Sequence, residues 1–196
     1  MGEVKTIAVI GAGTLGREIA QAAAAGGYRT IVEDLVPGAL RHAEQQARLS
    51  FARAVESGAL SGGEAARALG RLEYADRPEE AAREADFVIE AVPDDLESKL
   101  EIFTLLDKVC RPGTILVSNT VGFSISEIAA ITYRPAHVLA MRFPLPMAEG
   151  RLIQVVRGRA TDEATVAQAV EVGGRMGKQV RVFRDALADS PLPGAS

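Results

Sequence analysis

Three glycines near the amino terminus have the spacing of a phosphate-binding turn. The stretch GAGTLG, residues 11–16, directly follows a branched apolar run and opens an alanine-rich helical stretch. In a strand–turn–helix unit the first glycine permits a tight turn, the second lets a pyrophosphate approach the backbone, and the third lets helix and strand pack closely. The free N–H groups and the positive dipole end of the helix then face the phosphates. We therefore expect a dinucleotide to contact Gly11, Ala12, Gly13, Thr14, Leu15 and Gly16.

Two carboxylates follow the next apolar run and could recognise a ribose. Glu33 and Asp34 end the stretch YRTIVED, and Asp34 lies 18 residues beyond Gly16. A carboxylate at this place can bind a ribose 2′-hydroxyl and would repel a 2′-phosphate. The sequence therefore predicts NAD rather than NADP as the cofactor, with Asp34 as the candidate and Glu33 as the alternative.

Branched apolar runs alternate along the chain with stretches of helical periodicity. The runs at 6–13, 28–34, 86–93, 113–120, 137–144, 151–158 and 178–185 are predicted strands. Helices are predicted between them, with Ser124 or Ser126 as the cap of a short one. This alternation predicts an α/β fold, a Rossmann-like doubly wound, mainly parallel sheet covered on both faces. We expect one domain over residues 1–185 and a short, disordered tail over 186–196.

Composition excludes several classes of function. The 196 residues carry a formal net charge of −4 without a basic cluster, which argues against nucleic acid as a partner. A lone Cys110 and two distant histidines, His42 and His137, give no metal-site pattern. No apolar run reaches the roughly 20 residues of a membrane span, and the amino terminus lacks the order of a signal peptide. We expect a cytoplasmic protein that binds no metal and does not enter a membrane.

Several stretches together resemble the NAD-binding domain of the 3-hydroxyacyl-CoA dehydrogenases, including the 3-hydroxybutyryl-CoA enzymes. They are KTIAVIGAGTLGREIAQAAAAGGY, ADFVIEAVPDDLESK, PGTILVSNT, SISEIAA and RLIQVVRG, in the family's order and spacing. The resemblance implies an oxidoreductase of fatty acid metabolism, with Asp34 at the adenosine ribose. It also implies cofactor contacts on the nicotinamide side from Ala91, Val92, Asp94, Lys99 and Asn119. These residues follow predicted parallel strands, where open α/β sheets bind ligands.

The same resemblance predicts a catalytic set that this chain lacks. A serine, a histidine base, an asparagine and a glutamate that orients the histidine are expected where Val121, Arg142, Leu145 and Gln154 stand. Oxidation of a 3-hydroxyl group needs a proton acceptor, and an arginine with a pKa above about 12 cannot serve. No catalytic residue of the family is therefore intact. His137 lies five residues before Arg142, and we expect it at the other end of the strand in a surface or capping role.

Family members continue into an all-helical domain that covers the acyl group, whereas eleven residues follow Asp185 here. The family also projects a pair of helices that touches coenzyme A, expected here at about 38–72. Ser50 falls near a coenzyme A position, but Ser57 stands where a lysine is expected. This hairpin could simply pack on the domain, or associate with another copy through a stripe formed by Leu40, Ala47, Phe51 and Val55.

Three hypotheses follow from the sequence. The preferred one is an NAD(H)-binding protein that has lost the ordinary dehydrogenase reaction. The second is an oxidoreductase with altered chemistry that acts on a 3-hydroxyacyl-CoA or another 3-hydroxy acid, in which Arg142 binds an anionic substrate and a different group moves the proton. An acyl-CoA or another small anionic ligand is the expected binding partner. The third is a subunit that needs a helical partner chain. Pairing of Arg142 with Glu149 or Asp94 would instead indicate a structural role for the arginine.

Overall fold

The computed structural model describes residues 2–186, so all of the predicted tail except Ala186 lies outside the described residues. Eight strands form one sheet in the order β3-β2-β1-β4-β5-β6-β7-β8. They are β1 (Thr6–Ile10), β2 (Arg29–Glu33), β3 (Leu72–Ala75), β4 (Phe87–Glu90), β5 (Ile115–Ser118), β6 (Val138–Arg142), β7 (Leu152–Arg157) and β8 (Gln179–Arg184). All neighbouring strands are parallel except β6 and β7.

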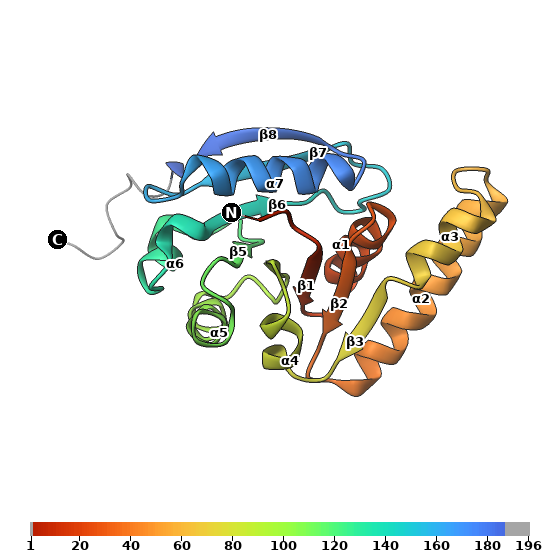
Figure 1. Ribbon diagram of the computed structural model, residues 1–196, viewed down its shortest axis with the longest axis horizontal. Coiled ribbons are helices and arrows are strands. Elements are labelled where there is room, and N and C mark those ends of the chain that lie inside the picture. Colours follow the sequence, from red (N-terminus) through yellow and green to blue (C-terminus); the bar gives the residue numbers. More distant parts are fainter. Residues whose placement is uncertain (1, 187–196) are drawn as a thin grey trace.

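Helices cover both faces of this sheet (Figure 1). They are α1 (Thr14–Ala25), α2 (Pro37–Glu56), α3 (Gly62–Leu69), α4 (Pro78–Arg83), α5 (Leu96–Val109), α6 (Ile125–Ala130) and α7 (Glu163–Arg175). Helices α1 and α7 and the first turns of α2 bury apolar side chains against one face of the sheet. Helices α4, α5 and α6 bury theirs against the other face. The central strands have no exposed face, which explains why they read as continuous apolar runs. The predicted doubly wound fold is confirmed.

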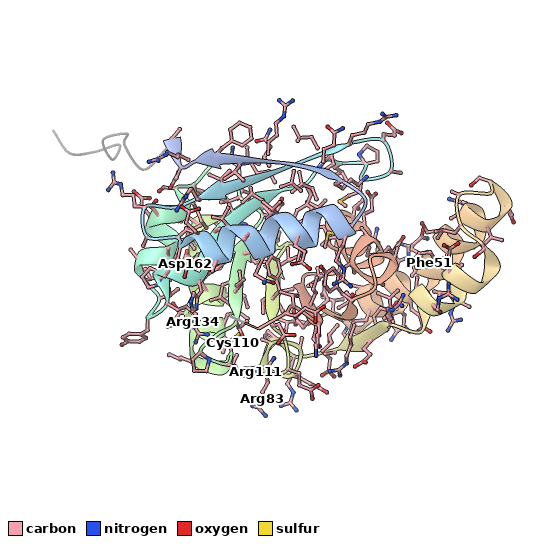
Figure 2. All side chains as sticks on the ribbon, turned by 45° about the horizontal axis from the view of Figure 1, so that its top comes forward. Phe51, Arg83, Cys110, Arg111, Arg134 and Asp162 are labelled. Carbon is pink, nitrogen blue, oxygen red and sulfur yellow. The ribbon has the colours of Figure 1, made fainter. Side chains whose placement is uncertain are left out.

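Helices α2 and α3 project from the sheet as a hairpin (Figure 1). Ala47 and Phe51 of α2 pack against Ala65 and Ala68 of α3 in a small core of their own. Phe51, labelled in Figure 2, is 5% exposed. Ala47 and Phe51 of the apolar stripe therefore hold the hairpin together, whereas Val55 is 36% exposed. Self-association through this stripe stays a prediction.

Two elements were missed by the sequence pattern. Strand β3 has the sequence LEYA, with the exposed Glu73 in its centre, and among residues 2–186 it pairs only with β2, at the edge of the sheet. Helix α4, Pro78–Arg83, has six residues and begins at a proline. Both are too short and too polar to produce a clear apolar period.

Candidate cofactor site

The glycine turn connects β1 to α1 at the carboxyl edge of the sheet, and it is packed against its neighbours. The N–H of Gly11 donates to the carbonyl of Glu33 (2.8 Å), and the φ of Gly11 is +103°. A Cβ atom on Gly16 would lie 1.9 Å from the carbonyl oxygen of Gly11. A Cβ atom on Gly13 would meet nothing within 4 Å. Packing therefore requires glycine at 11 and 16, whereas the open space at 13 suits a ligand.

Asp34 lies directly after β2 and holds two backbone segments together. Its Oδ2 accepts a hydrogen bond from the N–H of Ala12 (2.9 Å), and its Oδ1 accepts one from the N–H of Val36 (2.9 Å). The carboxylate is therefore fixed beside the glycine turn and remains partly exposed. Each carboxylate oxygen can accept a further hydrogen bond, so the group is available to a ribose hydroxyl.

Glu33 points elsewhere and is buried, with an exposure of 2%. Its Oε1 has no hydrogen-bond partner among the described residues. Burial, with smaller contributions from the charges of Asp34, Glu79 and Asp76, raises the pKa of Glu33 to about 7. The structure thus favours Asp34 over Glu33 as the carboxylate that a ribose can reach.

Lys99 does not reach the surface of the site. Its ammonium is fully buried and lies 2.9 and 2.8 Å from the two carboxylate oxygens of Glu90, at the end of β4. Ser118 donates to the same carboxylate (2.7 Å), and so does the N–H of Val92 (2.9 Å). Burial raises the pKa of Glu90, while Lys99, Ser118 and Val92 act in the opposite direction. Lys99 therefore connects α5 to β4 and β5 beneath the site. The sequence did not indicate Glu90 and Ser118 as members of this buried group, because the fold alone brings them next to Lys99.

Asp94 shapes the loop that follows β5. Its Oδ2 lies 3.3 Å from the N–H of Val121 and 3.2 Å from that of Gly122, both of which donate to it. Its Oδ1 lies 3.5 Å from the ammonium of Lys99. Partial burial acts to raise the pKa of Asp94, but the hydrogen bonds from Thr120, Val121 and Gly122 outweigh it and lower the pKa. The carboxylate is therefore charged at neutral pH and keeps the loop close to the end of β4.

Arg142 ends β6 and leans towards this loop. Its Nε donates to the carbonyl of Thr120 (3.0 Å). Neither Glu149 nor Asp94 forms an ion pair with it in the described part of the chain, so the pairing that would have indicated a structural role is not found there. Gln154 of β7 is directly opposite Arg142 in the sheet register. Asn119 follows β5, the strand next to β6, and its Oδ1 accepts a long hydrogen bond from the N–H of Phe143 (3.5 Å).

The remaining two positions at which the family resemblance predicts catalytic polar groups are exposed and apolar. Val121 is 65% exposed and Leu145, which precedes a cis proline, is 57% exposed. No imidazole stands near them: His137 lies in a turn before β6 and faces Pro112, and His42 is exposed on α2. The predicted placement of His137 at the far end of β6 is confirmed. Between residues 2 and 186 the site therefore contains no histidine base.

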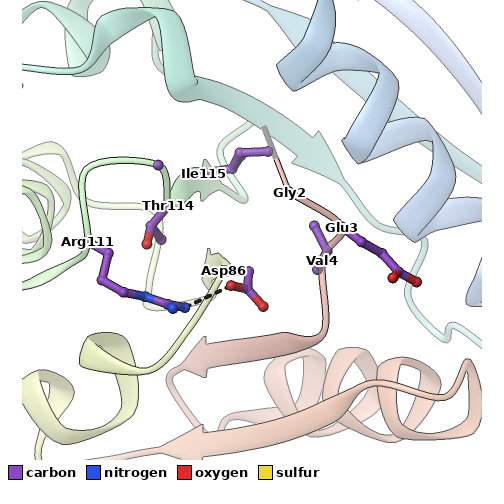
Figure 3. Close-up of a pocket in the computed structure, with 8 residues that line it drawn as sticks. Gly2, Glu3, Val4, Asp86, Arg111, Thr114 and Ile115 are labelled. Atoms are coloured by element: carbon purple, nitrogen blue, oxygen red, sulfur yellow. Dashed lines mark hydrogen bonds and ion pairs between the residues drawn. The ribbon is translucent and has the colours of Figure 1, made fainter.

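A separate pocket lies at the opposite, amino edge of the sheet (Figure 3). It has a volume of about 270 Å³ and lies between the start of β1 and the starts of β4 and β5. Arg111 and Asp86 pair across it at 2.7 Å, and Asp86 also accepts from the N–H groups of Lys5 and Thr6. The charged groups of this pocket stabilise the ends of strands, and the pocket is separate from the cofactor site at the opposite edge of the sheet.

Residues 2–186 contain no cluster of histidine, cysteine and carboxylate side chains that could hold a metal ion. No helix in this range is long and apolar enough to span a bilayer. Ser50 is exposed on α2, and the Oγ of Ser57 donates to the carbonyl of Ala54. Coenzyme A contact by the hairpin stays a prediction.

Comparison with known proteins gives a consistent result. Residues 6–186 match the family model described as 3-hydroxyacyl-CoA dehydrogenase, NAD binding domain. A probable 3-hydroxybutyryl-CoA dehydrogenase of Bacillus subtilis is 39% identical over 90% of this chain, and a 3-hydroxyadipyl-CoA dehydrogenase of Escherichia coli is 37% identical over 90%. The crystal structure of 3-hydroxybutyryl-CoA dehydrogenase from E. coli superposes over 94% of this chain with a TM-score of 0.90 and 35% identity. The chain spans 61% of the B. subtilis protein, 37% of the 3-hydroxyadipyl-CoA enzyme and 39% of the crystallised chain.

Proposed function

The chain belongs to the 3-hydroxyacyl-CoA dehydrogenase family through its NAD-binding domain, and we propose that it binds NAD(H) without catalysing the ordinary oxidation of a 3-hydroxyacyl-CoA. In the proposed binding mode the pyrophosphate lies at Gly13 and the adenosine ribose at Asp34. The nicotinamide lies near Asn119, beside the Ala91–Val92 segment and the loop that Asp94 holds. Lys99 acts as a positioning residue through Glu90.

The geometry of the glycine turn supports this binding mode. The backbone N–H groups at the start of α1 are available to phosphate, because Gly13 provides no side chain as a cap. The space next to Gly13 is open, and the nearby Asp34 carboxylate is held by Ala12 and Val36. A negative carboxylate at the ribose favours NAD over NADP because a 2′-phosphate would be repelled.

The proposed loss of dehydrogenase activity is supported mainly by the identity of two residues, Arg142 and Gln154. These residues are directly opposite each other in the sheet register, where the family resemblance predicts a histidine and the glutamate that orients it. A guanidinium has no lone pair to accept a proton at neutral pH, and a neutral amide cannot stabilise an imidazolium by charge. A general base typically contributes 10²–10⁴-fold to the rate.

The names of the relatives favour the alternative function, in which the chain is an active oxidoreductase. Curated relatives are named as 3-hydroxybutyryl-CoA and 3-hydroxyadipyl-CoA dehydrogenases, so an acyl-CoA is the natural substrate class to test. If the chain is an oxidoreductase on such a substrate, another group must move the proton. The exposed Val121 and Leu145 would suit a helical domain or partner chain over the site, which is the other alternative.

Calorimetric titration with NAD and NADP tests the binding mode. The unmodified protein is expected to bind NAD more tightly than NADP. Gly13→Val should leave the protein folded, because its side chain would meet no other residue near the Cβ atom. It should weaken NAD binding, because the side chain would enter the space proposed for the pyrophosphate. Asp34→Ala should lower the NAD to NADP affinity ratio, whereas Glu80→Gln, at an exposed position on α4, should leave the ratio unchanged. Unchanged NAD affinity in folded Gly13→Val would exclude the proposed site.

A further inference from the structure

We propose that the terminal guanidinium edge of Arg142 is a binding site for the carboxylate of a short hydroxy- or oxo-acid beside the nicotinamide. The inference rests on the proposed NAD-binding mode and specifies which ligand the same site would accept. It concerns binding, and it assigns no proton transfer to the arginine.

Arg142 is oriented but not neutralised. The hydrogen bond from its Nε to the carbonyl of Thr120 directs the side chain towards the loop after β5. This contact uses one of the five N–H donors of the guanidinium and leaves both terminal nitrogens without a partner among residues 2–186. The residue is only partly exposed and sits on a strand, so its position is fixed before any ligand arrives.

The nearby carboxylates are engaged by other groups. Asp94 accepts from the N–H groups of Val121 and Gly122 and lies close to Lys99. Glu90 is fully buried against Lys99 and Ser118. Neither forms an ion pair with Arg142 in the described part of the chain. The guanidinium at the carboxyl edge of the sheet therefore has no carboxylate within ion-pair distance among residues 2–186.

Two amides beside Arg142 add donors. Asn119 uses its Oδ1 to accept from the N–H of Phe143, and its amide nitrogen has no partner in the range 2–186. Gln154 is opposite Arg142, is partly exposed, and makes no side-chain hydrogen bond within that range. Donors without an acceptor next to a cation complement an oxyanion.

The surroundings favour a carboxylate on a small apolar body. The two terminal nitrogens of a guanidinium match the two oxygens of a carboxylate in a planar, bidentate pair. Val121 and Leu145, 65% and 57% exposed, provide apolar surface in the loops next to Arg142 and Asn119. A thioester carries no charge at the corresponding place, so it would leave the arginine unpaired. The site thus favours the free acid over its thioester.

Titration of the NADH-saturated protein with 3-hydroxybutyrate or acetoacetate tests this site. Both acids are expected to bind, whereas methyl 3-hydroxybutyrate, which has the same body without the charge, is not. Arg142→Gln should weaken binding at least tenfold. Gln154→Glu should do the same, because it places a carboxylate directly opposite Arg142.

Arg83→Gln is the matched control. Arg83 ends α4 just before β4, at the opposite edge of the sheet from Arg142, is exposed, and forms no ion pair with residues 2–186. Its removal changes the net charge equally and should leave carboxylate affinity unchanged. Equal affinity for the ester, equal affinity for inorganic phosphate, or full affinity in folded Arg142→Gln would overturn the assignment. NAD titration of each variant separates this outcome from failure of the cofactor site: a protein that binds NAD but no carboxylate refutes only the Arg142 site.

Discussion

Gln154 of β7 lies directly opposite Arg142 of β6 in the antiparallel pair of strands. Side chains at opposed positions of such a pair share one face and have Cβ atoms about 5 Å apart. The sheet register therefore places these two positions side by side, as a base and its orienting acid would need. The side chains that occupy them are a guanidinium and a neutral amide.

Introducing the four residues that the family resemblance predicts tests how far these positions limit oxidation of a 3-hydroxyacyl-CoA. The variant Val121→Ser, Arg142→His, Leu145→Asn and Gln154→Glu should show little oxidation of 3-hydroxybutyryl-CoA alone, because residues 2–186 include no helical domain that would position the acyl group. Activity should increase when the helical domain of a relative is supplied in trans. The assay is NADH formation, with the unmodified chain plus the same helical domain as the control. Equal activity in control and variant would show that these four positions do not limit the reaction.

Gly16 and Gly13 should differ in what their substitution changes. Gly16→Ala places a Cβ atom 1.9 Å from a backbone carbonyl oxygen, so we expect a loss of about 3 kcal/mol or more in the free energy of unfolding. Gly13→Ala meets no atom within 4 Å and should retain its stability. Urea denaturation measures both. A stable Gly16→Ala protein would show that the turn can move away from α1.

The buried pair of Lys99 and Glu90 should stabilise the sheet edge beneath the site. Lys99→Met leaves a carboxylate buried without its cation, and the expected loss is about 3–5 kcal/mol in the free energy of unfolding. Adding Glu90→Gln should recover part of that loss, because the unpaired charge is removed. Lys108→Met, at an exposed position of the same helix, is the control. Additive effects of the two substitutions in urea denaturation would contradict a coupled pair.

Glu33 should make stability depend on pH. Its pKa is raised from 4.5 to about 7 in the folded protein, so the folded state retains a proton that the unfolded state loses first. The contribution of Glu33 is therefore fully present below pH 4.5 and is lost as pH rises towards 7, by up to about 3 kcal/mol. Glu33→Gln should remove this decrease, and Glu80→Gln should not. Parallel stability–pH curves for Glu33→Gln and the unmodified protein, measured by urea denaturation, would refute this assignment.

The sequence was most informative where one local pattern fixes both the structure and its chemistry. The glycine spacing together with the acid after the second strand predicts the turn with Asp34 beside it, and the structure has this arrangement. Their contact with a cofactor stays a prediction. The central strands were equally clear, since burial on both faces leaves long apolar runs.

The contacts between distant segments could not be read in this way. Lys99 looked like a surface cofactor contact, but its partner Glu90 is on another element and the pair is buried. Arg142 donates its hydrogen bond to a backbone carbonyl, and a contact of this kind cannot be predicted from the pattern of side chains in the sequence. Strand β3 was missed because an edge strand with a central glutamate has no apolar run.

Hydride transfer at saturating NAD is the most direct test of the proposed function. The protein, shown by titration to hold NAD in the same sample, is incubated with 3-hydroxybutyryl-CoA and NADH formation is followed by absorbance. The corresponding segment of the B. subtilis relative serves as the control for any effect of chain length. We predict bound NAD and no NADH formation above the rate without protein. Turnover on the order of 10 per second, a typical enzyme rate, would contradict the proposal and require a base other than the residue at position 142.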